Sequence, residues 1–290
     1  MNNKSRKKWG YILIAPQLIG LLVFSLLPLL FAFGLSLTQW NGFGSPVFIG
    51  IENFILQFQN PAFNTALINT FYYSVLYIPI SIILALLVAL ALNNIKGKEL
   101  YRFFFFAPVV TSSVSISVIW MWIYNADLGI INQFLANFGI EGPRWISSTT
   151  WVIPSIAILS IWWQLGYNMV IFLAGLKGIS QTYYEAAEMD GATPFRKFWS
   201  ITLPLLSPTT FFVAIMSVIT SFQVFDQAFV MTNGGPGKAS YTLVYHVYDS
   251  AFRKFDFGAS ASAAVILFAF ILIFTLIQFF GSRKWVHYEG

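Results

Sequence analysis

Charged side chains are scarce in this sequence: Asp, Glu, Lys and Arg make up 9% of its 290 residues, against about 25% in soluble domains. Hydrophobic residues make up 57%, and the mean hydropathy is +0.71. Cysteine is absent, which excludes disulfide scaffolds, thiolate metal sites and thiol catalysis. Two histidines occur, His246 and His287, too far apart in the chain to form a ligand cluster. The composition therefore predicts an integral membrane protein and excludes intrinsic disorder.

Six apolar stretches are long enough for helices that cross a bilayer, which needs roughly 20 residues each. Their helical length argues against a β-barrel, whose strands alternate over about ten residues. The first stretch stays apolar past Leu30 and has no small-residue cleavage site, so it is interpreted as a retained span and not a signal peptide. We therefore predict an all-α, polytopic membrane protein: a tail at 1–10 and a six-span domain at 11–290. The predicted spans are 11–33, 69–92, 103–124, 151–176, 206–231 and 260–281.

The basic residues flank these stretches unevenly. Twelve Lys and Arg fall in the two tails and the second-to-third and fourth-to-fifth connections, and four fall in the other connections. Because cytoplasmic loops carry the excess of Lys and Arg, both termini are predicted to be cytoplasmic. The same pattern accounts for the net charge of +5, so nucleic acid is not predicted as a partner.

The fourth-to-fifth connection, 178–204, contains the most specific pattern. Thr182 and Glu185 have the spacing of a capping box, which predicts a short helix over 183–190. Gly191 stands where a helix ends in left-handed geometry, and Thr193 and Pro194 are suited to begin a second helix. Aromatic and apolar residues are unusually many for a cytoplasmic loop. Such a surface suggests either a docking site for another protein or an interfacial helix on the headgroups.

This connection resembles the EAA loop of ABC-importer permeases, on the strength of Glu185 to Ala187, Asp190 to Ala192, and Ile201, Leu203 and Pro204. Four further strings resemble the carbohydrate-uptake branch, which includes permeases for maltose, multiple sugars, raffinose, lactose and glycerol-3-phosphate. These strings are IGIENF (49–54), LGIIN (128–132), FLAGLKGI (172–179) and MTNGGPG (231–237). The resemblance covers nearly the whole chain. The large periplasmic insertion of the maltose member is absent here, so the compact multiple-sugar or glycerol-phosphate type is the better match.

The resemblance implies the type I ABC importer permease fold. It also implies a subunit of a sugar importer in a bacterial or archaeal plasma membrane, with an oligosaccharide as the expected substrate. The implied partners are a second homologous permease, two copies of a cytoplasmic ABC ATPase and an extracytoplasmic sugar-binding protein. The 178–204 segment is then the coupling segment that enters a groove of the ATPase. The residues implied to dock are Tyr184, Glu185, Ala186, Ala187, Asp190, Gly191 and Ala192.

The chain itself is predicted to bind no cofactor and to be no enzyme. A phosphate-binding loop needs a glycine-rich turn that ends in Gly-Lys-Ser/Thr. The nearest string, GGPGKAS at 234–240, has Ala239 where a hydroxyl must reach magnesium. ATP and Mg²⁺ are therefore expected to be used by the separate ATPase subunits.

A sugar site needs hydrogen-bonding side chains together with flat apolar surfaces. In span five, Ser217, Thr220, Ser221 and Val224 have the spacing of one helix face. The resemblance to the maltose permease suggests that this face contacts the sugar, although Ser and Thr also mediate plain helix packing. In span four, Gln164, Tyr167 and Asn168 share a face that is predicted to line a path or to bond a neighbouring helix.

Gln223, Asp226 and Gln227 are predicted to continue span five toward the outside, with Asp226 the only carboxylate within the six spans. An ionisable group there is a functional hypothesis by default. It is expected either to accept hydrogen bonds from a sugar or to pair with Arg253 or Lys254. An anionic substrate would be repelled by this carboxylate, which favours a neutral sugar.

Two further interpretations stay open. A self-sufficient secondary transporter or channel would need membrane-embedded charges for ion coupling, and Asp226 is the single candidate. A membrane-embedded enzyme would need a nucleophile, base or metal constellation that the sequence does not supply. The external stretches 51–67 and 241–257 are amphipathic, and they are expected either to receive the binding protein or to lie on the membrane.

Overall fold

The computed structural model describes residues 3–93 and 95–286, with side chains from residue 11 onward. The predicted tail is therefore described only as backbone from residue 3, and His287 lies outside the described residues. The described chain is mainly helical, with one two-stranded sheet, and it divides into two units. One unit joins 3–61 with 246–268, and the other joins 62–245 with 269–286.

Helices long and apolar enough to cross a membrane number four within the described chain. They are Tyr11–Ser36, Pro61–Asn93, Val152–Gly178 and Phe257–Ser282. Two bent helix pairs, Lys98–Val110 with Ser113–Ile123 and Pro194–Leu205 with Ser207–Phe222, bring the count to six if each pair forms one span. The predicted all-α fold with up to six spans is confirmed.

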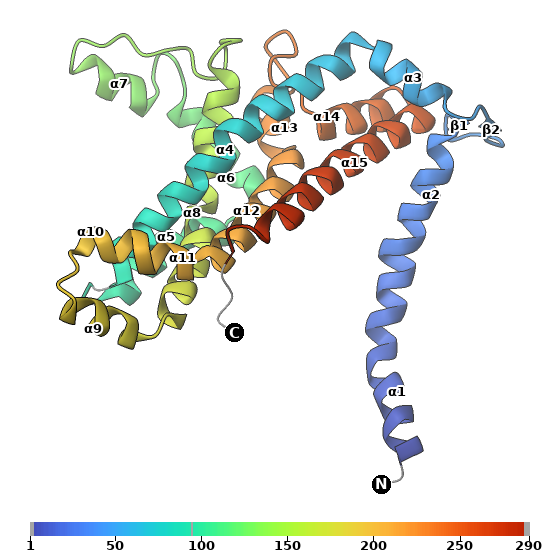
Figure 1. Ribbon diagram of the computed structural model, residues 1–290. Helices are drawn as coiled ribbons and strands as arrows, with labels where there is room; N and C mark the ends of the chain where they lie inside the picture. Colours follow the sequence, from blue (N-terminus) through green and yellow to red (C-terminus); the bar gives the residue numbers. More distant parts are fainter. Residues whose placement is uncertain (1–2, 94, 287–290) are drawn as a thin grey trace. The chain divides into compact units, whose positions relative to one another are not determined.

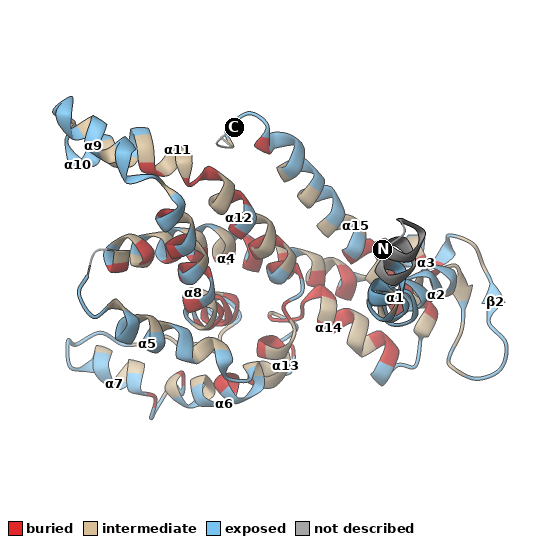
Figure 2. Ribbon diagram, turned by 90° about the horizontal axis from the view of Figure 1, so that it is seen from below, coloured by how far each residue is buried: buried red, intermediate tan, exposed pale blue. Residues whose placement is uncertain are grey.

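The first unit begins with a long apolar helix and continues into a small hairpin. Its side chains in the first candidate span are not covered by the rest of the described chain, as the pale blue of α1 and α2 in Figure 2 shows. β1 and β2 pair antiparallel, with Thr38 opposite Phe48. The elements are α1 (Asn3–Leu21), a π-helical turn (Leu22–Leu26), α2 (Leu27–Ser36), β1 (Thr38–Gln39), β2 (Val47–Phe48), α3 (Glu52–Gln59) and a second π-helical turn (Asp249–Arg253).

Two amides of α3 hold the first unit together. Asn53 Nδ2 donates to the carbonyls of Ser36 and Thr38 at 3.0 and 2.8 Å. Gln57 Nε2 donates to Ala259 O at 2.7 Å, and its Oε1 lies 2.9 Å from His246 Nε2. Both amides are buried, so the amphipathic stretch expected at 51–67 has its polar face inside, where it satisfies backbone carbonyls.

The second unit contains the helices that form the candidate sites. α14 (Leu243–Tyr248) and α15 (Phe257–Ser282) each have residues in both units. In Figure 1, α7 and the pair α9–α10 lie at opposite ends of α8. The elements are α4 (Pro61–Asn93), α5 (Lys98–Val110), α6 (Ser113–Ile123), α7 (Ile130–Ala136), α8 (Val152–Gly178), α9 (Gln181–Met189), α10 (Pro194–Lys197), a π-helical turn (Phe198–Thr202), α11 (Leu203–Leu205), α12 (Ser207–Phe222) and α13 (Asp226–Thr232).

α8 is the most buried of the candidate spans, with 56% of its apolar window covered by the chain, and it is largely red in Figure 2. Toward one end, Ile156 and Leu159 pack with Tyr73 of α4 and Ala228 of α13. Toward the other, Phe172 belongs to a second cluster with side chains of α4 and α12. α8 is therefore the central packing element of the second unit.

Gly166 is the point of closest approach between α8 and α5. A Cβ at this position would lie 2.1 Å from the carbonyl oxygen of Phe105. The absence of a side chain therefore lets the two helix backbones meet, as small residues do at helix interfaces in membranes.

We predict that Gly166→Ala lowers the thermal stability of the purified protein, because overpacking of a tight contact costs about 1–3 kcal/mol. Gly178→Ala, on the same helix, is the matched control, since a Cβ there meets nothing within 4 Å. The melting temperature in detergent is the measurement. Equal melting temperatures for the two variants would contradict this close contact.

Candidate functional site

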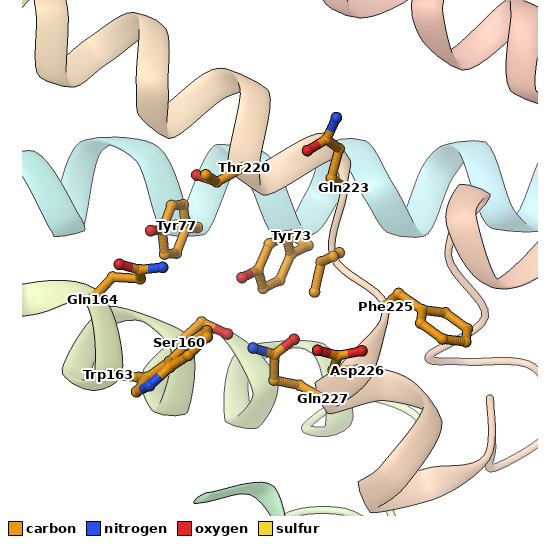
Figure 3. A pocket seen from close by; sticks show the side chains of 11 residues that line it. Tyr73, Tyr77, Ser160, Trp163, Gln164, Thr220, Gln223, Phe225, Asp226 and Gln227 are labelled. Carbon is orange, nitrogen blue, oxygen red and sulfur yellow. The ribbon is translucent and has the colours of Figure 1, made fainter. Parts of the chain in front are cut away.

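A polar pocket of about 230 Å³ lies in the second unit, among α4, α8, α12 and the start of α13. In Figure 3 the labelled side chains from α4, α8 and α13 face a common space, whereas the ring of Phe225 points away from it. It combines aromatic rings, amides, hydroxyls and one carboxylate. The lining residues are Tyr73, Tyr77, Ser160, Trp163, Gln164, Thr220, Gln223, Val224, Phe225, Asp226 and Gln227.

Two tyrosines of α4 form one wall. Tyr73 and Tyr77 are one helical turn apart, and their rings stack with centroids 5.6 Å apart and an interplanar angle of 12°. Each is 3% exposed, so the rings are fixed by packing. The pocket therefore offers a rigid aromatic surface next to the amide of Gln164.

The helix expected at 206–231 is interrupted beside the pocket, which corrects the prediction of one continuous span. α12 ends at Phe222, and the amides of Gln223 and Val224 bond back to the carbonyls of Thr220 and Ser221. A new helix, α13, begins at Asp226. Val224 consequently does not continue the helix face of Ser217, Thr220 and Ser221. The break turns Gln223 and Asp226 toward the pocket.

The helix expected at 103–124 is also broken, since α5 ends at Val110 and α6 begins at Ser113 with a bend of 99°. The two breaks are joined: the Ser113 hydroxyl donates to the Asp226 carboxylate. The indole nitrogen of Trp163 donates to the carbonyl of Thr111 at 3.2 Å. The pocket therefore lies where two interrupted helices meet and are bridged by side chains.

The partner of Asp226 within the described chain is thus Ser113, and not a cation. Arg253 and Lys254, expected as alternative partners, form ion pairs with Asp249 at 3.7 and 2.9 Å. Asp226 therefore keeps a second carboxylate oxygen for a ligand in the pocket.

Four of the eight predicted substrate residues line the pocket, and four do not. Gln164, Thr220, Gln223 and Asp226 lie together. Ser217, Ser221 and Asn168 are buried between helices, and the Ser221 hydroxyl donates to its own helix at Val218 O. Tyr167 is 38% exposed and lies away from the lining. Ser217 and Asn168 lie one helical turn from Thr220 and Gln164, respectively, and are buried against neighbouring helices.

Several lining residues were not predicted. The spacing of Tyr73 and Tyr77, two tyrosines one turn apart inside an apolar stretch, was a usable signal. Ser160 and Trp163 share the α8 face of Gln164, at four residues and one residue before it. Gln227, predicted with Gln223 and Asp226 to continue span five, also lines the pocket, at the start of α13.

The fourth-to-fifth connection forms a two-helix bracket, which we define as residues 178–205. α9 spans Gln181–Met189, and its N-cap is Ser180, whose hydroxyl accepts from the Thr182 amide. The predicted cap at Thr182 is therefore wrong by two residues, because Ser180 already offers a cap with extended backbone geometry.

The corner of the bracket has the predicted form. Gly191 has φ +71°, and its amide donates to Glu188 O while the Ala192 amide donates to Ala187 O. These two bonds form a Schellman motif, which ends a helix at a left-handed residue. Thr193 then caps the second helix by accepting from the Arg196 amide, with Pro194 at its first position.

Apolar side chains project from the bracket without cover from the described chain. Met189 is 90% exposed and Phe195 75% exposed. Among the predicted docking residues, Glu185, Ala186, Asp190 and Gly191 are exposed, whereas Tyr184, Ala187 and Ala192 are half-buried. The bracket thus has the exposed apolar surface that a protein partner would cover.

In the part of the chain that the structure describes, no three His, Cys, Asp or Glu side chains form a group able to hold a metal ion. The pocket contains one such residue, Asp226. Its chemistry is that of hydrogen bonding and ring stacking.

We predict that Ser113→Ala lowers both the stability and the transport activity of the protein, because a hydrogen bond to a charged group contributes about 1.5–3 kcal/mol. Ser112→Ala is the matched control, since the neighbouring Ser112 makes no side-chain capping bond. Melting temperature and uptake are measured together. Identical behaviour of the two variants would show that the bridge to Asp226 is dispensable.

The chain matches known transport proteins over most of its length. Residues 81–286 match the family described as "Binding-protein-dependent transport system inner membrane component". It is 37% identical to the "Probable ABC transporter permease protein YesP" of Bacillus subtilis, over 97% of this chain and 92% of that protein. It is 34% identical to the sn-glycerol-3-phosphate transport system permease protein UgpA of Agrobacterium fabrum, over 96% of each chain.

The fold is shared with a solved transporter. A chain of a bacterial ABC transporter involved in the import of the acidic polysaccharide alginate superposes with a TM-score of 0.84 at 22% identity, over 97% of this chain and 96% of that one. The predicted fold of an ABC importer permease is confirmed by this likeness. The chain belongs to the inner-membrane components of binding-protein-dependent transport systems.

Proposed function

We propose that this chain is a permease subunit of an ABC importer and moves a sugar, delivered by an extracytoplasmic binding protein, into the cytoplasm. The observation that carries the proposal is the pocket at the two helix breaks. Stacked Tyr73 and Tyr77 offer a flat apolar surface, and Gln164, Gln223 and Gln227 offer amides. Rings with flanking hydrogen-bonding groups match the apolar faces and hydroxyl edges of a sugar.

The charge of the pocket favours a neutral sugar. Its eleven lining residues include the carboxylate of Asp226 and no Lys, Arg or His. An anionic substrate would meet that carboxylate without a compensating cation, in an environment where charge is costly. The proposed substrate therefore differs from the glycerol-3-phosphate for which some relatives are named and from the acidic polysaccharide of the alginate transporter.

The size of the pocket favours passage of an oligosaccharide one sugar ring at a time. Its volume of about 230 Å³ is below the roughly 300–1,000 Å³ of ordinary ligand pockets. We therefore propose an oligosaccharide that occupies this half-site one ring at a time. A second homologous permease would cover the remaining side of the path.

Energy is proposed to enter through the bracket. The chain lacks a phosphate-binding loop, so ATP and Mg²⁺ would be used by two copies of a separate ATPase. The exposed Met189 and Phe195 would lie in that subunit's groove, beside Glu185. The bracket lies at the end of α8 opposite α7, as Figure 1 shows, which is consistent with an inner membrane in which the bracket and both termini are cytoplasmic.

We expect Glu185→Lys and Gly191→Pro to uncouple ATP hydrolysis from uptake while leaving membrane insertion intact. The first reverses a charge on the docking surface. The second is incompatible with φ +71°, because proline fixes φ near −65°. Gln181→Lys, an exposed change at the other end of α9, is the control. The assay compares sugar uptake with ATP hydrolysis in proteoliposomes, and wild-type uptake by both variants would contradict coupling through the bracket.

The neutral-sugar proposal is tested on the partner binding protein, by its thermal stabilisation with neutral oligosaccharides, uronate-containing oligosaccharides and glycerol-3-phosphate. A ligand at 100 times its Kd adds about 2.7 kcal/mol, which raises the melting temperature by several degrees. Neutral sugars should produce the shift. A shift with the anionic compounds alone would contradict the proposal.

A further inference from the structure

The two helices of the bracket are tied together at two points. Lys197 Nζ lies 2.7 Å from Glu188 Oε1. The hydroxyls of Tyr184 and Thr202 lie 3.0 Å apart. Each tie joins α9 to the helix that follows the Gly191 corner. Of the four tied residues, Tyr184 alone is among those predicted to contact the ATPase.

The spacing of the ties depends on a π-helical turn. Tyr184 and Glu188 are four residues apart, so they share one face of α9. Lys197 and Thr202 are five residues apart, which would place them on different faces of a regular α-helix. The turn Phe198–Thr202, in which the Leu203 amide donates to Phe198 O, adds the extra residue. It brings both side chains to the face that meets α9, and such π-helical insertions are frequent at functional sites.

Packing does not fix α9 and α10 in place, although the bracket packs against the rest of the unit at Ile179 and at the buried Thr202. α9 and α10 contain no buried residue. A cavity of about 400 Å³ lies behind them, and its wall includes Leu90 of α4 and Leu176 of α8 together with both tied pairs. Since the two helices do not rest closely on the body of the unit, the ties determine the angle between them.

The second helix of the bracket leads directly to the pocket. It runs from Pro194 to Leu205 and continues, after a 63° bend, into α12. α12 presents Thr220 to the pocket and ends at the break occupied by Gln223. A displacement of α9 therefore reaches the pocket only if the two bracket helices move as one body.

We infer that the Glu188–Lys197 ion pair and the Tyr184–Thr202 hydrogen bond are positioning contacts that make the bracket rigid, so that motion of a docked ATPase is transmitted to α12. This inference rests on the proposed function. The ties are not a stability device: exposed ion pairs contribute little to folding, and Glu188 has 63% of its side chain exposed. We expect these contacts to affect the number of sugar molecules imported per ATP hydrolysed.

The test uses the complete importer with its ATPase and loaded binding protein in proteoliposomes, and measures sugar molecules imported per ATP hydrolysed. Glu188→Lys and Lys197→Glu each replace the attraction with repulsion, and the double exchange restores an ion pair of reversed polarity. Arg196→Glu is the control, since Arg196 is exposed and forms no ion pair within the described residues. Tyr184→Phe removes the second tie without changing the ring.

Each single exchange should lower import per ATP at least about fivefold, the lower end of ordinary coupling effects. The double exchange should recover the wild-type ratio within about twofold, as expected for a directly interacting pair. ATPase association and melting temperature should stay at wild-type values in the charge-exchange variants, and Tyr184→Phe should lower the ratio further when combined with a single exchange.

Two results would overturn the inference. One is a wild-type ratio in both single exchanges. The other is a double exchange as poorly coupled as the singles, which would show that the residues act separately. A wild-type chain that never associates with an ATPase would instead overturn the proposed function, and the positioning role with it, so the two failures are distinguishable.

Discussion

The constraint on which this structure depends is that backbone amides and carbonyls have no water to bond inside a bilayer. A transmembrane helix can therefore stop only where protein or a water-filled cavity covers its ends. Two candidate spans do stop, between Val110 and Ser113 and between Phe222 and Asp226. Trp163 bonds the free carbonyl of Thr111, and Ser113 bonds Asp226. The pocket occupies the place where these interruptions are covered by polar side chains.

One of these interruptions is joined to the bracket by α12. α12 is a helix of 16 residues, with the bracket at one end and the pocket at the other. A straight apolar helix through this region would offer neither amides for a sugar nor a hinge for motion. The break after Phe222 places Gln223 and Asp226 at the pocket, and a separate 63° bend near Ser207 lies between the bracket and α12. In the proposed function, the break serves substrate contact and the bend lies on the route of energy coupling.

Much of this could be predicted from the sequence, and the failures have physical causes. The spans were predicted from the lengths of the apolar stretches. The bracket was predicted from Gly191 and Pro194, because glycine is favoured where φ is positive and proline fixes φ at the start of a helix. The helix breaks were not predicted because only the length of each apolar stretch was considered, although the polar runs Thr111–Ser113 and Gln223–Gln227 mark both positions in the sequence. Ser217 and Asn168 were assigned to the pocket because spacing alone cannot distinguish a face that lines a cavity from one that packs on a neighbour. Which residues contact a sugar stays a prediction.

The central claim, that the bracket receives the motion of an ATPase on the cytoplasmic side, is tested most directly by crosslinking from Met189. The chain contains no cysteine, so Met189→Cys introduces a single thiol at a position that is 90% exposed. The account predicts a crosslink to the ATPase subunit that changes with nucleotide, and protection of this thiol from membrane-impermeant reagents in intact cells. Labelling of the thiol from outside the cell, with no crosslink to the ATPase, would contradict the account.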